Sequence, residues 1–184
     1  MGDDLETWTK ITEGNAEAFD SFYRENQPRL CAFLRQLVSS YQAAEDLAQE
    51  TFAQIWNRPN GFNPERGTLR GYLYGIGRKR ASEWWRSHRP TEYSDVDTMD
   101  ADHAERNSII HDAWQRLPED YRSLLWLREV EGRSYAELAE ILEIPVGTVR
   151  SRLFAAREAL RKIWHGTAIK KELAGGLHDL RRSG

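Results

Sequence analysis

Apolar residues recur at spacings of three and four along most of the chain, which is the period of an amphipathic helix. Three such stripes lie within residues 18–23, 30–38 and 42–56. The third contains Ala44, Leu47, Ala48, Phe52, Ile55 and Trp56. Ser39 or Ser40 can cap the N-terminus of that third helix. A fourth helix is predicted from about Thr68 to Arg86, and no segment shows the alternation of a strand.

The helical pattern stops after Pro90 and resumes near Ser108. The stretch from Thr91 to Glu105 holds six acidic residues, no basic ones and no apolar periodicity, which predicts an extended linker. Beyond it, Pro118 suits the first turn of a helix that Gly132 ends. The predicted buried stripe of that helix is Tyr121, Leu124, Leu125 and Val130.

The predicted fold class is therefore all-α, with two small helical domains joined by an acidic linker. The expected boundaries are a four-helix domain at 1–90, the linker at 91–107 and a second domain at 108–164. The tail at 165–184 has no assignment.

The second domain contains the pattern of a helix-turn-helix. Ser134 and Glu137 have the spacing of a capping box at the start of a short helix. A tight turn at residues 143–145 leads to a longer helix with a buried stripe of Val146, Val149, Leu153, Ala156, Leu160 and Ile163. Its other side carries the candidate duplex-reading residues Thr148, Arg150, Ser151, Arg152, Phe154 and Arg157. Arginines there can donate to guanine edges or phosphates. The alternative is a plain helical hairpin with solvated arginines.

Charge is segregated along the chain. The net charge is −3, yet residues 59–90 carry +5 and residues 132–184 carry +4. The compensating acidic blocks are residues 1–58, at −5, and 91–131, at −7. Two positive surfaces of this kind favour phosphate-bearing partners.

The first basic block interleaves cations with aromatic rings. On a helical wheel Tyr74, Arg78 and Trp85 lie opposite an apolar stripe, so we expect them to be exposed. Unpaired bases stack on such rings while cations follow the backbone. The alternative is that a tryptophan packs on a neighbouring helix and the arginines are solvated.

Other function classes find little support. The single cysteine, Cys31, lies in an apolar stretch and is expected to be a small core residue. The five histidines form no metal-ligand pattern, and no phosphate loop or nucleophile elbow occurs. We therefore expect no catalytic residues, cofactor or metal. The lack of an export signal or a spanning apolar segment favours a cytoplasmic protein without membrane insertion.

Four segments, taken together, resemble a known family. They are Glu45–Phe52, Tyr72–Ile76, Leu117–Glu119 and Ser134–Leu153. In order and spacing they resemble the signature segments of extracytoplasmic-function sigma factors of bacterial RNA polymerase, over about residues 15–164.

The resemblance implies a role for each surface. The first domain would match sigma region two and bind core RNA polymerase through Asp46, Gln49, Glu50 and Gln54. It would read the minus-ten element of promoter DNA as a single strand with a flipped base, through Asn63, Arg66, Tyr74, Arg78, Lys79, Arg80 and Trp85. The second domain would match region four and read the minus-thirty-five element as duplex. The linker would occupy a basic channel of the polymerase, and an anti-sigma factor is expected as a protein inhibitor.

Three positions depart from the family pattern. Lys79 stands where asparagine is frequent, beside the expected flipped-base pocket. Glu143 stands where the turn usually has glycine, which costs roughly 1 kcal/mol if the residue is left-handed. Ala155 replaces a frequent basic residue, so one DNA contact is expected to be missing.

Two alternatives use only part of these features. A stand-alone repressor or activator explains residues 108–164 and leaves the first basic block without a role. An adaptor that binds only protein leaves both basic surfaces unexplained.

Overall fold

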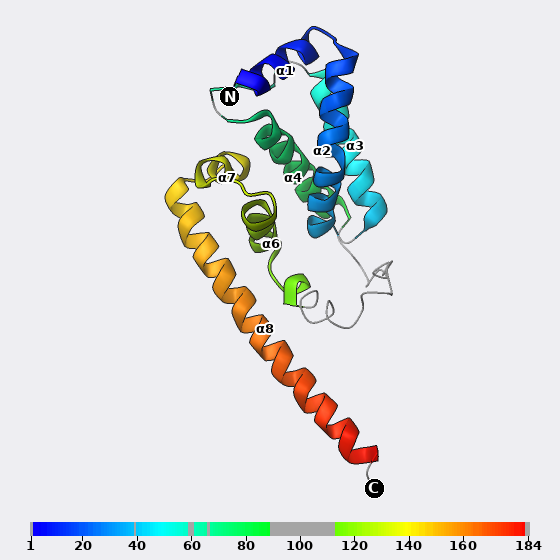
Figure 1. Ribbon diagram of the computed structural model, residues 1–184, viewed down its shortest axis with the longest axis vertical. Coiled ribbons are helices and arrows are strands. Elements are labelled where there is room, and N and C mark those ends of the chain that lie inside the picture. Colours follow the sequence, from blue (N-terminus) through cyan, green and yellow to red (C-terminus); the bar gives the residue numbers. More distant parts are fainter. Residues whose placement is uncertain (1, 39, 59–60, 66, 89–112, 183–184) are drawn as a thin grey trace.

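The computed structural model describes residues 2–38, 40–58, 61–65, 67–88 and 113–182, and those residues contain helices and no strand. The first four helices are α1 (Gly2–Thr12), α2 (Ala16–Leu37), α3 (Tyr41–Asn57) and α4 (Leu69–Ser87). The later elements are α6 (Glu119–Leu125), the π-helical turn η2 (Trp126–Val130), α7 (Tyr135–Leu142) and α8 (Val146–Arg182). Figure 1 shows these as two groups of helices, which confirms the all-α prediction. The expected linker lies outside the described residues.

The first group packs α2, α3 and α4 side by side, with α1 across one end (Figure 1). Ser40 caps α3 by accepting from the Ala43 amide at 3.2 Å, as one of the two predicted caps. Thr68 caps α4 in the same way, from Gly71 at 3.0 Å. Gly77 allows helices α2 and α4 to approach closely, since a Cβ at this position would lie only 3.0 Å from the Leu30 side chain. Within the predicted third stripe, Trp56 at the end of α3 is 38% exposed, so its assignment to the buried face was wrong.

The second group confirms the helix-turn-helix pattern. Ser134 and Glu137 form both hydrogen bonds of the capping box at the start of α7. Gly132, two residues before Ser134, has a positive φ of 67°. Glu143 ends α7 in the left-handed conformation, with φ 56° and ψ 42°, so this chain bears the strain of a side chain at that position.

Two predicted core residues of this group are exposed, namely Val146 at the start of α8, which is 40% exposed, and Val130. Val130 is 58% exposed, although Leu124 and Leu125 are buried as expected. The reason is the π-helical turn, where the Glu131 amide donates to Trp126 five residues earlier. The wider turn changes the angular spacing on which the helical wheel depends. Leu127 is buried in its place.

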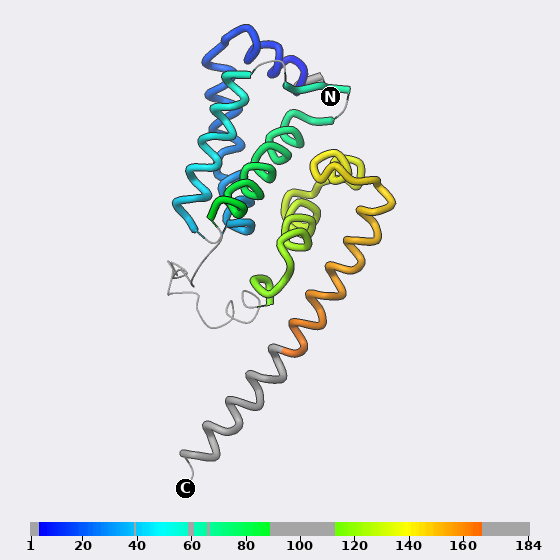
Figure 2. Tube along the Cα trace, turned by 180° about the vertical axis from the view of Figure 1, so that it is seen from behind, coloured from blue at the N-terminus to red at the C-terminus, as the bar shows by residue number. Residues whose placement is uncertain are grey.

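The two groups pack against each other, which the sequence did not predict. Helix α4 contacts α7, and α2 contacts α6; both views show α6 and α7 lying between α4 and α8 (Figures 1 and 2). Their buried apolar residues form one continuous core. Across the same boundary, Trp114 donates its indole N–H to the Gln36 side chain at 2.7 Å.

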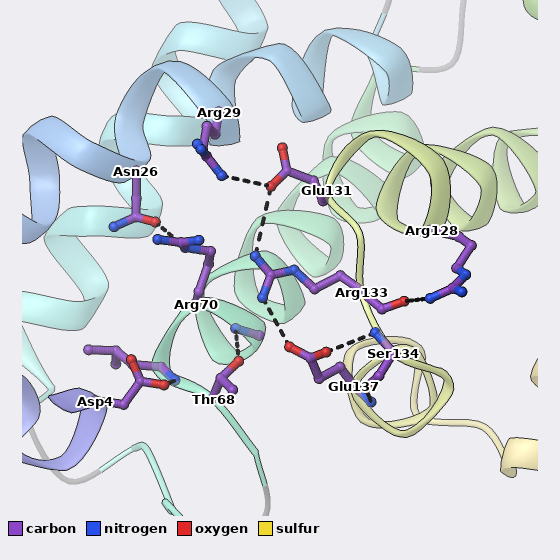
Figure 3. A network of polar contacts seen from close by, with 12 residues as sticks. Asp4, Asn26, Arg29, Thr68, Arg70, Arg128, Glu131, Arg133, Ser134 and Glu137 are labelled. Carbon is purple, nitrogen blue, oxygen red and sulfur yellow. Dashed lines mark hydrogen bonds and ion pairs between the residues drawn. The ribbon is translucent and has the colours of Figure 1, made fainter. Parts of the chain in front are cut away.

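A charged network lies at the centre of this boundary (Figure 3). Arg133 reaches Glu137 at 3.0 Å and Glu131 at 3.8 Å. Arg29, from α2, reaches the same Glu131 carboxylate at 3.7 Å. The side chains of Glu131 and Arg133 are only 5% and 9% exposed. A buried charge is costly without its partner. Each charged group in this network therefore stabilises the contact between the two domains only while the others are present.

Candidate nucleic-acid and polymerase interfaces

The first turns of α8 present the predicted duplex-reading surface. Arg150, Ser151 and Arg152 are exposed there, and Phe154 is 70% exposed. Thr148 is half-buried and accepts a hydrogen bond from Ser151 through its carbonyl. Val149, Leu153 and Ala156 are buried, so the opposite side of α8 holds it on the domain. The surface therefore has the layout predicted for a helix that enters a groove.

Arg157 differs from the other arginines of α8. Its Nε and Nη2 atoms both donate to the Glu129 carboxylate, at 3.1 and 2.6 Å. This interaction raises the pKa of Arg157. A guanidinium held in this way has fewer donors for DNA than Arg150, whose group lies 6.0 Å from the Tyr135 ring in a cation–π contact.

On α4, the expectation that Tyr74 is exposed was wrong. Tyr74 is 1% exposed. Its ring lies 5.1 Å from that of Phe33 and 5.6 Å from the Arg133 guanidinium. Burial and the nearby Glu131 carboxylate raise the pKa of its hydroxyl. The helical wheel failed here because Phe33 of α2 and Arg133 of the second domain both pack on this ring.

Trp85 is also less accessible than predicted. It is half-buried, and its indole N–H donates to the Leu37 carbonyl at the end of α2, 2.8 Å away. Trp84 packs on the core as well, as the alternative interpretation had it for one tryptophan.

Three consecutive cations of α4 each face a carboxylate. Arg78 lies 3.6 Å from Asp120 and Lys79 lies 2.7 Å from Glu143, and both carboxylates belong to the second domain. Lys79 and Glu143 are two of the three departures from the family pattern, and the structure pairs them with each other. Arg80 instead turns to α3, where it contacts Glu50 and Gln54.

Beside these pairs, a cleft of about 1020 Å³ separates the loop before α4 from α7 and the turn after it. Asn63 lines it and is exposed, and its side chain accepts from the Glu65 amide at 2.9 Å. Arg66 lies outside the described residues. The cleft's walls include Phe62, Tyr72 and Ile76 from the first domain and Ile141 and Ile144 from the second.

Family models match both groups of helices. The model described as "Sigma-70 region 2" matches residues 22–91, and "Sigma-70, region 4" matches residues 108–160. The RNA polymerase sigma-H factor of Pseudomonas aeruginosa is 34% identical, over 83% of this chain and 89% of its own length.

The chain belongs to the extracytoplasmic-function sigma factors of bacterial RNA polymerase. The ECF RNA polymerase sigma-E factor of Haemophilus influenzae is 31% identical, over 82% of this chain and 89% of its own length. As a sigma factor the protein directs promoter-specific transcription initiation by RNA polymerase.

Solved structures agree on the fold. RpoE of Bartonella quintana, solved with the anti-sigma factor NepR, has a TM-score of 0.63 at 26% identity and covers 80% of this chain and 97% of its own. CnrH, solved with the cytosolic domain of CnrY, has a TM-score of 0.69. It covers 89% of this chain and 97% of its own at 22% identity, and shows the fold alone.

The sigma factor's candidate polymerase-binding residues share one side of α3. Asp46, Gln49 and Glu50 are exposed and Gln54 is half-buried. Asp46 accepts from Gln42 at 3.3 Å. The opposite side, with Ala44, Leu47, Ala48 and Phe52, is buried. The predicted separation of an acidic outer face from a buried stripe is therefore present.

Sequence reasoning missed the buried charges of the sigma factor. Arg122 and Arg133 are 9% and 8% exposed, and burial lowers the pKa of Arg122. Arginine is rarely buried unless it is paired, so a pattern that counts arginines as surface gave no signal for either residue.

Proposed function

We propose that the protein binds core RNA polymerase through the outer face of α3, reads the minus-thirty-five element as duplex with α8, and reads the minus-ten element as a single strand with α4 and the loop before it. The observation that carries this proposal is the exposed arginine surface on the first turns of α8, held by an apolar opposite face. We place the domains at residues 1–90 and 108–164, joined by the acidic linker at 91–107, and leave 165–184 without a role.

The packing of the two domains adds a requirement to this proposal. The elements at minus ten and minus thirty-five are about 25 base pairs apart, or about 85 Å along B-form DNA at 3.4 Å per base pair. Domains joined through Tyr74 and Arg133 cannot each occupy one of two sites at that distance. The two domains therefore separate when the sigma factor engages a promoter.

An anti-sigma factor is the expected inhibitor, since the relative RpoE named above was co-crystallised with the anti-sigma factor NepR. We place the protein in the cytoplasm, where its polymerase and DNA partners are. We propose no catalytic role, because each predicted site residue has a place in binding.

Run-off transcription with core polymerase and genomic DNA fragments, followed by mapping of start sites, tests the proposal. We expect start sites that share upstream and downstream elements. The docking variant is Asp46→Lys with Gln49→Lys, which leaves the Glu50–Arg80 contact in place. It should abolish co-purification with core polymerase at physiological salt while its circular dichroism spectrum stays unchanged. Retained co-purification would contradict the docking surface.

A further inference from the structure

Arg80 joins the two helices to which we assign polymerase binding and DNA reading. Its Nη1 donates to Glu50 Oε2 at 2.5 Å, and its Nη2 donates to Gln54 Oε1 at 2.9 Å. The two acceptors lie four residues apart, so they share one side of α3 and are adjacent on it. Arg80 thus uses its planar fork to hold two neighbouring side chains of the docking face at once.

The position of Arg80 sets it apart from the other cations of α4. Its side chain is 25% exposed, and its Nε is buried without a partner among the described residues. Lys79 is 60% exposed and points to the second domain. Arg86 is exposed, and its one polar contact within the described part of the chain is to a carbonyl of its own helix, at 3.4 Å. The family resemblance assigned Arg80 to the DNA-reading set, whereas its side chain contacts Glu50 and Gln54 of α3.

We propose that Arg80 is a positioning residue for polymerase docking, which orients Glu50 and Gln54 for their partner; this rests on the docking face assigned above. Glu50 is 57% exposed, and its second oxygen can still accept from a basic group of the polymerase. Fixing a side chain before binding removes part of the entropy that binding would otherwise cost. With two side chains fixed, we expect loss of the fork to lower affinity for core polymerase by about fivefold to fiftyfold.

The test is the affinity of the full chain for core polymerase without DNA, so that DNA contacts cannot contribute. Arg80→Ala and Arg80→Lys should both lose affinity, because lysine keeps the charge but lacks the planar fork. The matched control is Arg86→Ala, which removes one positive charge from α4 without touching α3 and should leave this affinity unchanged. If Arg80→Lys binds as the unaltered chain does, only the charge matters and the proposal is wrong.

A double-mutant cycle shows whether Arg80 acts through the docking face. In a chain that already carries Glu50→Ala and Gln54→Ala, the further change Arg80→Ala should cause no additional loss. An additional loss of full size would overturn the proposal. If Glu50→Ala with Gln54→Ala itself leaves polymerase affinity unchanged, the docking face is wrong, and the role of Arg80 falls with it.

Thermal unfolding of each variant separates orientation from stability. A lower melting temperature together with unchanged polymerase affinity would mean that Arg80 only joins two helices, which overturns the proposal. Unchanged polymerase affinity with weaker promoter opening would return Arg80 to the DNA-reading set.

Discussion

The two predicted DNA-reading helices are in opposite states. On α8, Arg150 and Arg152 are exposed, and within the described residues neither forms an ion pair. On α4, Tyr74 is buried, and Arg78 and Lys79 face acidic residues of the other domain. In this arrangement the surface that we propose for duplex DNA is accessible on α8, while Tyr74, which was predicted to contact unpaired bases, is covered. The comparison suggests an order of events in which the domains separate before the single strand is read.

The largest expected effect comes from breaking the buried network that covers α4. Arg133→Met removes the charge beside Glu131, which is 5% exposed and then keeps Arg29, at 3.7 Å, as its ion-pair partner among the described residues. Breaking a buried pair costs about 3–5 kcal/mol, and the long distances here place this one near 3 kcal/mol. Urea denaturation should show that loss in the free energy of unfolding.

The matched control is Arg29→Met, because Arg29 contacts the same carboxylate from a half-exposed position. It should cost less than about 1 kcal/mol. Fluorescence energy transfer between labels at Glu17→Cys and Lys162→Cys should show wider separation of the domains in Arg133→Met than in Arg29→Met. Burial raises the pKa of Cys31, so the introduced exposed cysteines should react first. Equal costs for the two variants would mean that Glu131 is not buried in solution.

A smaller effect is expected on the exposed helix. Arg150→Ala should weaken recognition of the upstream element by about 1–3 kcal/mol if the contact is bidentate to a base. Arg157→Ala should cost less and act evenly across sequences, because Glu129 already occupies that guanidinium. Promoter binding by the holoenzyme, with the upstream element intact or substituted, measures both. A larger, sequence-dependent loss in Arg157→Ala would reverse the two roles.

The sequence predicted what local patterns determine. The capping box at Ser134, the cap at Ser40 and the end of a helix at Gly132 depend on neighbouring residues, and each is present. The outer face of α3 followed from periodicity alone. Val130 failed because a π-helical turn breaks the period on which the wheel depends.

The surroundings of Tyr74 and Arg80 were missed for a different reason. Their surroundings are set by residues far along the chain, namely Arg133 for Tyr74 and Glu50 for Arg80. A helical wheel shows which residues share a face but not what covers that face. Lys79 and Glu143 were each noted as unusual, but only the structure shows that they lie 2.7 Å apart.

Changes to the pair of Lys79 and Glu143 should give the smallest effect. Replacing Glu143 with glycine should stabilise the turn before α8 and weaken the contact that covers α4. Glu143→Gly should relieve the strain of a φ of 56°, a gain of about 1 kcal/mol for the turn that positions α8. It also removes the exposed partner of Lys79, worth about 0.2–1 kcal/mol to the contact that covers α4. The melting temperature of Glu143→Gly should therefore rise slightly, while the energy transfer between the labels at residues 17 and 162 should fall.

The control variant Glu143→Gln removes the charge and keeps the strained side chain, so it should weaken the domain contact without the gain in stability. High salt should abolish the difference in domain separation between Glu143→Gln and the unaltered chain, since it screens exposed pairs. If Glu143→Gly and Glu143→Gln unfold at the same temperature, the left-handed turn carries no strain in solution, and the ion pair alone accounts for glutamate at this position.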